Sequence, residues 1–213
     1  MEFRSLVLLS DVCMRKILNM LSARRGIDHA TLNAETDVLN AAIRSVAIPV
    51  DDRVAFGMRA AEVAGQVTPA AIDMLVSRLH APTSPIPEAF ESSARGHGAW
   101  LAAWQFAVFE ILFQFRESAL GVLREIAWGE YDWTQGNALE ILVRLAAKGI
   151  GREDTIADFH REFERVSDEA KRYAIGPLLH RAKFESEVAA IVGELHSVPE
   201  WREVVWEMEG RKS

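Results

Sequence analysis

Apolar residues recur at helical spacing along almost the whole chain. In residues 6–21 they fall three or four positions apart, and the following Arg24-Arg25-Gly26 has the cations and glycine typical of a helix C-terminus. The same spacing predicts further helices over residues 32–46, 54–63, 72–79, 186–197 and 199–208. No segment has the alternation expected of a strand. Together with residues 99–115 and 116–183, the pattern predicts an all-α protein of about eleven helices.

Residues 99–115 are apolar on nearly every face of the helix that they predict. Their only polar members are Gln105, Glu110 and Gln114. All-round hydrophobicity indicates a helix that is buried in the protein or crosses a membrane. We favour a buried helix and no membrane, because residues 99–115 are at the short limit for a span and Glu110 would lie deep in hydrocarbon.

Residues 116–183 contain two copies of one helix-turn-helix unit, offset by 36 residues. The coinciding apolar positions are Leu120 and Ile156, Leu123 and Phe159, Ala138 and Ala174, Leu139 and Ile175, Leu142 and Leu178, Val143 and Leu179, and Ala146 and Ala182. Small residues therefore recur at the same places in the second helix of each copy. Self-similarity at this period predicts a helical array.

This unit resembles the HEAT and armadillo repeats, in which antiparallel helix pairs carry a small residue and two branched residues at fixed places. The resemblance covers residues 116–183 and, less closely, residues 51–79. Asp132 and Asp168 match part of the Asp and Arg pattern that often marks HEAT turns and helix starts. The resemblance implies a HEAT-like α-α superhelix with a concave surface that a partner would occupy.

Three prolines make residues 81–87 the strongest loop signal in the chain. A hinge between two subdomains is one interpretation of this loop, but no shift in composition separates its flanks. We therefore expect residues 1–213 to form a single all-helical domain.

The charge is acidic and unevenly distributed. Residues 1–107 carry 10 basic and 11 acidic side chains, net −1, and residues 108–213 carry 14 and 20, net −6. An acidic second half argues against nucleic acid, which needs clustered Lys and Arg, and favours a partner with a basic surface. The single cysteine, Cys13, excludes an internal disulfide, and no targeting segment is recognisable, so we expect a cytoplasmic protein.

No motif in the sequence fixes a reaction. His160 and Glu164 lie one helical turn apart near Asp154, Asp158 and Glu162, but the set lacks a recognised metal-ligand spacing, so we predict no metal and no cofactor. Phosphate-binding glycine loops and nucleophile elbows are missing as well, so no catalytic residue is assigned. An enzyme with a small-molecule pocket near residues 97–115, using Glu110 and His97, is the alternative.

Aromatic and acidic residues crowd the turn of the first repeat. Trp128, Glu130, Tyr131, Asp132 and Trp133 lie within six residues. Two interpretations are open, because the tryptophans could fill gaps between helix ends or bind a partner, as aromatic residues often do.

We expect the surfaces of the repeat to form one continuous partner-binding face, to which Asp154, Asp158 and Glu162 add acidic charge. The leading hypothesis is a non-enzymatic protein-binding module. An immunity protein that covers the basic active site of a toxin is its most specific form.

Overall fold

The computed structural model describes residues 29–81, 85–91, 96–130 and 132–210, with side chains described from residue 35 onward. The helix predicted over residues 6–21 and Cys13 lie outside the described residues. The described parts contain eleven α-helices and no strand, which confirms the all-α prediction. The helices are α2 (His29–Ala47), α3 (Arg53–Gln66), α4 (Ile72–Ser77), α5 (Glu88–Glu91), α6 (Gly96–Gln114), α7 (Leu120–Trp128), α8 (Gln135–Ala147), α9 (Arg152–Glu162), α10 (Asp168–Ala182), α11 (Ser186–Leu195) and α12 (Pro199–Met208).

Helix α6 joins the two halves of the molecule. The N-terminal helices α2, α3, α4 and α5 pack on it, and α8 packs on it from the other half. Most of its residues are therefore buried, which explains its all-round apolar sequence. No helix in the described ranges is long and apolar enough to span a membrane.

Polar atoms on α6 find partners in the segment that follows α4. The indole Nε1 of Trp104 donates to the carbonyl oxygen of Arg78 at 2.8 Å, and the Gln105 amide donates to that of Leu79 at 3.3 Å. Because buried polar groups need hydrogen bonds, these two contacts fix how α6 lies against the end of α4. Residues 85–87, the described end of the proline-rich loop, lie near α2, where Arg44 donates to the carbonyl oxygen of Pro85.

Helix α8 is the centre of the C-terminal half. It packs against α6, α7, α9, α10 and α11. The positions that coincide between the two repeat units are buried or half-buried in both copies, as Leu142 and Leu178 are. The periodicity therefore identified the core faces of α8 and α10 correctly.

A glycine allows α8 and α10 to approach each other closely. A Cβ atom on Gly136 would lie 2.6 Å from Cβ of Tyr173 and 2.8 Å from the carbonyl oxygen of Ala170. These distances are shorter than van der Waals contact, so the helices can pack this closely only with glycine at this position.

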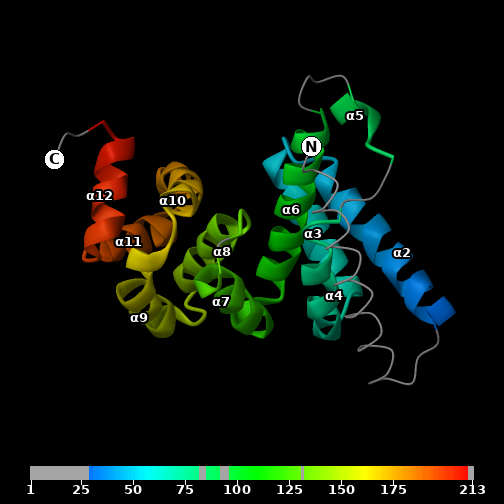
Figure 1. Cartoon of the computed structure of the whole chain (residues 1–213), viewed down its shortest axis with the longest axis horizontal. Helices are drawn as coiled ribbons and strands as arrows, with labels where there is room; N and C mark the ends of the chain where they lie inside the picture. The colour runs from blue at the N-terminus through cyan, green and yellow to red at the C-terminus, as the bar shows by residue number, and fades with distance from the viewer. Residues whose placement is uncertain (1–28, 82–84, 92–95, 131, 211–213) are drawn as a thin grey trace, which may run out of the picture.

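The helices of the two repeat units lie in two layers. In Figure 1, α10, α8 and α6 follow one another along the molecule, and α7 and α9 lie below them. Helices α10, α8 and α6 therefore share one side of the molecule, which we call the inner face. Helices α7 and α9 form the opposite, outer face.

Candidate functional site

A groove runs across the inner face. It consists of two pockets, of about 180 and about 400 Å³, that share Phe106 of α6 and Asn137 of α8. Helix α8 lies between α6 and α10 in Figure 1, so it forms the floor and its neighbours form the walls. We call the smaller pocket the aromatic pocket and the larger one the charged pocket.

The floor is a single stripe of side chains on α8. Trp133 just precedes the helix. Within the helix, Asn137, the adjacent residues Glu140 and Ile141, and Arg144 succeed one another at intervals of three or four residues. Residues at this spacing lie on one face of a helix. The stripe therefore runs from the aromatic pocket, at the start of α8, to the charged pocket, at its end.

Two largely exposed aromatic side chains flank the aromatic pocket. Trp133 is 61% exposed and Tyr173 of α10 is 52% exposed. Glu169, one turn before Tyr173 on α10, lines the same pocket together with Phe106. The close approach at Gly136 holds the start of α8 against the backbone of α10 at Ala170 and Tyr173.

The charged pocket contains a buried ion pair between α6 and α8. Arg144 donates to both carboxylate oxygens of Glu110, from Nη1 at 2.8 Å and from Nη2 at 2.9 Å. Both residues are less than a tenth exposed. Burial by itself would lower the pKa of Arg144, but the charge and hydrogen bonds of Glu110 and the charge of Glu140 raise it above its ordinary value. Arg144 is thus held in its charged form.

Further ion pairs extend this cluster to α10 and to the start of α3. Glu140 lies 3.8 Å from Arg144 and 3.2 Å from Arg181. Arg181 also pairs with Glu185 at 3.1 Å, and Arg53 lies 3.9 Å from the same carboxylate. The carboxylates and guanidinium groups of this pocket therefore largely neutralise one another.

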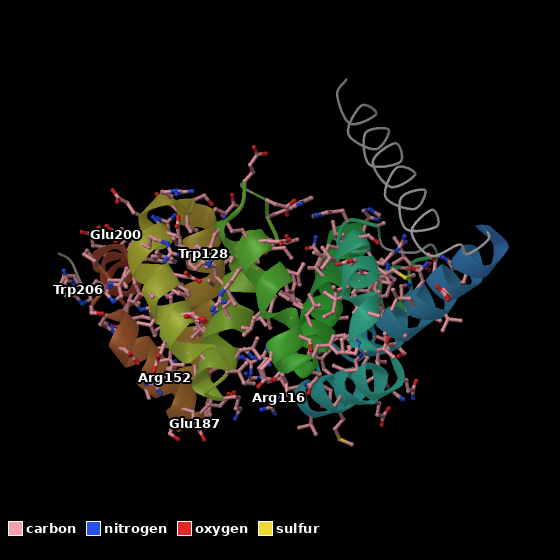
Figure 2. All side chains as sticks on the ribbon, turned by 90° about the horizontal axis from the view of Figure 1, so that it is seen from below. Arg116, Trp128, Arg152, Glu187, Glu200 and Trp206 are labelled. Atoms are coloured by element: carbon pink, nitrogen blue, oxygen red, sulfur yellow. The ribbon has the colours of Figure 1, made fainter. Side chains whose placement is uncertain are left out.

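Four of the residues predicted to bind a partner come together on the outer face. Trp128, Asp154, Asp158 and Glu162 line one pocket of about 300 Å³. Figure 2, which views the molecule from the side of α7 and α9, places Trp128 beside α9, and its ring packs edge-on against Phe159 at 5.2 Å.

The acidic residues of this outer pocket have basic partners. Arg124 lies 3.1 Å from Asp158 and 3.3 Å from Asp154, and Arg161 pairs with both Asp158 and Glu162. Asp158 is buried. These partners leave less uncompensated charge on α9 than its sequence suggested.

The other predicted residues lie elsewhere. Trp133 lines the inner groove, Asp132 pairs with His80 at 3.2 Å, and Glu130 is exposed. Tyr131 falls outside the described residues. The predicted residues thus divide between two pockets, with Trp133 in the inner groove beside α8 and α10 and the set around Trp128 on the side of α7 and α9.

Sequence reasoning missed most residues of the charged pocket. Glu140, Arg144 and Arg181 were not predicted as site residues. The signal was present, because Asn137, Glu140 and Arg144 form a polar stripe opposite the apolar stripe of α8. A polar stripe ordinarily faces solvent, and nothing in the sequence indicated that neighbouring helices would enclose this one.

The residue pair considered for an enzyme is not brought together. His97 and Glu110 are 13 residues apart on α6, which corresponds to roughly 20 Å along the helix axis at 1.5 Å per residue. Both oxygens of Glu110 are held by Arg144. Among the described residues, no group of three or more His, Cys, Asp or Glu side chains is placed to hold a metal ion.

Comparison with known proteins adds no relative. No protein-family model, no curated protein and no solved structure matches the chain. The all-helical architecture is compatible with a helical repeat protein, and the function must be argued from the groove itself.

Proposed function

We propose that this chain is a non-enzymatic protein-binding module of HEAT-like or armadillo-like repeats, acting in the cytoplasm. The two repeat units, with their matching buried positions, support this assignment. So does the inner groove, because helical repeat proteins use extended inner surfaces for binding. In this proposal a segment of the partner lies along α8 between α6 and α10.

The observation that carries the proposal is the pair Trp133 and Tyr173. Both rings are mostly exposed, Trp133 lies just before α8 and Tyr173 lies on α10, and both line one pocket. Large exposed aromatic side chains that surround a pocket are typical of binding hot spots. They are also costly to leave in water, so a partner that covers them gains hydrophobic free energy.

We further propose that the partner has a basic surface, as a toxin neutralised by an immunity protein would, and that it is not a nucleic acid. The net charge of −7 supports this choice. Residues 185–210 contribute seven acidic side chains and a single arginine, Arg202. This concentration of negative charge near α11 and α12 would attract a basic protein over a long distance.

The test is affinity capture from the native organism with the full chain as bait, followed by mass spectrometry. Three baits are compared: the unmodified chain, a Trp133→Ala/Tyr173→Ala double variant, and a Trp206→Ala control on α12. We expect one basic protein to be retained by the first and third baits and lost from the double variant. Retention of the same proteins by all three folded baits would exclude the groove as the binding site.

Small-molecule binding is a second candidate, and the charged pocket supports it. Its volume of about 400 Å³ lies within the range of ligand pockets, and it combines Phe109 and Ile141 with several charged groups. A thermal-shift screen of cellular metabolites tests this candidate. In Ile141→Trp the larger side chain fills this pocket. A metabolite that still stabilises this variant binds elsewhere, and the charged pocket then no longer supports small-molecule binding.

A further inference from the structure

We propose, on the basis of the protein-binding function above, that the aromatic pocket receives a glutamine side chain of the partner, whose carboxamide pairs with the amide of Asn137. Asn137 lies on the floor of the groove, on α8, and lines both of its pockets. The proposal is based on hydrogen-bonding groups in this pocket that the fold itself leaves unused.

Asn137 is a buried amide without a partner. Its side chain is only 5% exposed, and within the described parts of the chain it makes no hydrogen bond. The amide is not sealed inside the core, because Asn137 lines both pockets. Buried polar groups in folded proteins are nearly always hydrogen-bonded to protein or to water. A ligand that enters the groove can therefore supply the partner that the protein does not.

A second buried amide lines the aromatic pocket from α6. Gln105 is 8% exposed, and its Nε2 donates to the carbonyl oxygen of Leu79. Its Oε1 has no partner among the described residues and remains an acceptor. The pocket thus combines N–H donors and an oxygen acceptor of Asn137 with a further acceptor of Gln105.

This combination favours a group that both donates and accepts hydrogen bonds. An ammonium or guanidinium group only donates, and a carboxylate only accepts. Neutral histidine does both, but its two nitrogens are separated across the ring and cannot both meet one amide. A primary carboxamide carries its donor and its acceptor side by side, so it can form two parallel hydrogen bonds with Asn137.

The other walls of the pocket suit the uncharged stem of glutamine. The volume of about 180 Å³ is below that of a pocket for a drug-sized ligand and fits one side chain. Leu101 and Phe106 offer apolar surface to the two methylene groups, and the largely exposed rings of Trp133 and Tyr173 flank them. Glu169, the one charged residue that lines this pocket in the described ranges, already has an interaction of its own.

The charged pocket also borders Asn137, but it is a poorer site for an uncharged amide. Its buried carboxylates, Glu110 and Glu140, are held by Arg144 and Arg181 at 2.8 to 3.2 Å. A carboxamide would have to compete there with charge-assisted hydrogen bonds, which are stronger than those between neutral groups. The aromatic pocket is thus the part of the groove that selects a carboxamide.

The experiment uses the full chain labelled with ¹⁵N and four blocked tripeptides, which differ only in a central Gln, Glu, Lys or norleucine. Binding is followed by the chemical shift of the Trp133 indole N–H, identified as the signal that is missing from Trp133→Leu. We expect the Gln peptide to bind with a Kd in the millimolar range. The norleucine peptide, whose side chain makes no hydrogen bond, and the Glu and Lys peptides should each bind at least about fivefold more weakly.

An isosteric variant removes the amide from the floor of the pocket. Asn137→Leu should weaken the Gln peptide about fivefold, to the level of the norleucine peptide. It should not lower the melting temperature, because the lost amide makes no hydrogen bond within the protein. Asn40→Leu makes the same chemical change on α2, outside the residues that line the groove, and should alter the binding of no peptide.

Four results would each overturn the assignment. They are no response of the Trp133 signal to any peptide, a Glu, Lys or norleucine peptide that binds as tightly as the Gln peptide, a preference for Gln that persists in Asn137→Leu, and a clear fall in melting temperature in that variant. The last would show that the amide of Asn137 is used within the fold.

The failure of this inference can be told apart from failure of the proposed function. A captured partner that depends on Trp133 and Tyr173, together with peptides that show no preference for Gln, leaves the groove as a binding site and removes the carboxamide assignment. A preference for the Gln peptide that depends on Asn137, without any captured protein, supports the carboxamide assignment and removes the protein-binding function.

Discussion

At the scale of single residues, Gly136 is a position at which one added methyl group should cost stability. The added Cβ of Gly136→Ala would overlap Cβ of Tyr173 and the backbone oxygen of Ala170. A backbone atom cannot move aside as a flexible side chain can, so α8 and α10 would have to separate. We expect a loss of about 1–3 kcal/mol in the free energy of unfolding, measured by urea denaturation.

Gly121 provides the matched control. It lies within α7, is exposed, and a Cβ there would meet no atom within 4 Å. Gly121→Ala should therefore raise stability by up to about 1 kcal/mol, because alanine has the higher helix propensity. If the two variants change the free energy of unfolding in the same direction, close packing of α8 against α10 does not explain why glycine is needed at position 136.

The buried pair Glu110 and Arg144 allows a second residue-scale prediction. Arg144→Met should cost about 3–5 kcal/mol, because it leaves the Glu110 carboxylate buried beside an uncharged side chain. Adding Glu110→Met should recover part of this loss. We expect a coupling energy of about 1–3 kcal/mol in a double-mutant cycle, measured by urea denaturation.

An exposed pair supplies the comparison for this cycle. Arg59 and Glu62 lie 2.8 Å apart on α3, with side chains about half exposed. Their coupling energy should stay below about 1 kcal/mol, since water screens the charges. If the coupling energy between Glu110 and Arg144 is no larger than this, burial does not strengthen their interaction.

At the scale of elements, the contribution of the short segment before α8 to the stability of the folded state is expected to depend on pH. Asp132 accepts a hydrogen bond from the backbone N–H of Thr134 at 2.8 Å and pairs with His80. Burial alone would raise the pKa of Asp132, but these contacts lower it below its ordinary value. A carboxyl group whose pKa is lowered on folding stabilises the folded state above its unfolded pKa of about 4 and loses this contribution as pH falls further.

Asp132→Asn should therefore destabilise the protein near neutral pH, and the difference from the unmodified chain should shrink as the pH falls below about 4. Urea denaturation over a series of pH values measures the difference. Asp73→Asn, the same change on an exposed residue of α4, should have little effect at any pH. If Asp132→Asn lowers the free energy of unfolding by the same amount at every acidic pH, the charge of Asp132 does not contribute to stability.

The helices themselves were largely predictable, since their apolar spacing follows from which face is buried. The apolar stripe identified the core face of α8, and the all-round apolarity of α6 identified a buried helix. The direction of Trp133 was not predictable, because it precedes the first turn of α8 and lies outside the helical repeat of positions. The face of the molecule on which Trp133 lies depends on how α8 packs against α10 at Gly136, and this is a tertiary contact.

At the scale of the whole molecule, the division into two faces changes how partner binding should be tested. Reversal of Asp158 is not a test of electrostatic steering, because Asp158 is buried and paired with Arg124 and Arg161. Such a change would primarily destabilise the fold. Acidic charge suited to steering lies instead near α12, where Glu200 and Glu203 stand on a helix at the end of the molecule.

With a partner in hand, steering and anchoring should be separable by kinetics. Glu200→Lys with Glu203→Lys should lower the association rate for a basic partner, with a smaller effect at high salt, and leave the dissociation rate nearly unchanged. Trp133→Ala should raise the dissociation rate by about thirtyfold, which corresponds to roughly 2 kcal/mol at a hot spot.

The matched control for the charge reversal is Glu88→Lys with Glu91→Lys on α5, far from α12 in Figure 1, which changes the net charge by the same amount. An equal fall in association rate for both pairs would show that only net charge matters and that α12 does not guide the partner. If neither pair nor Trp133→Ala changes a rate while the chain stays folded, the partner does not bind through the inner groove.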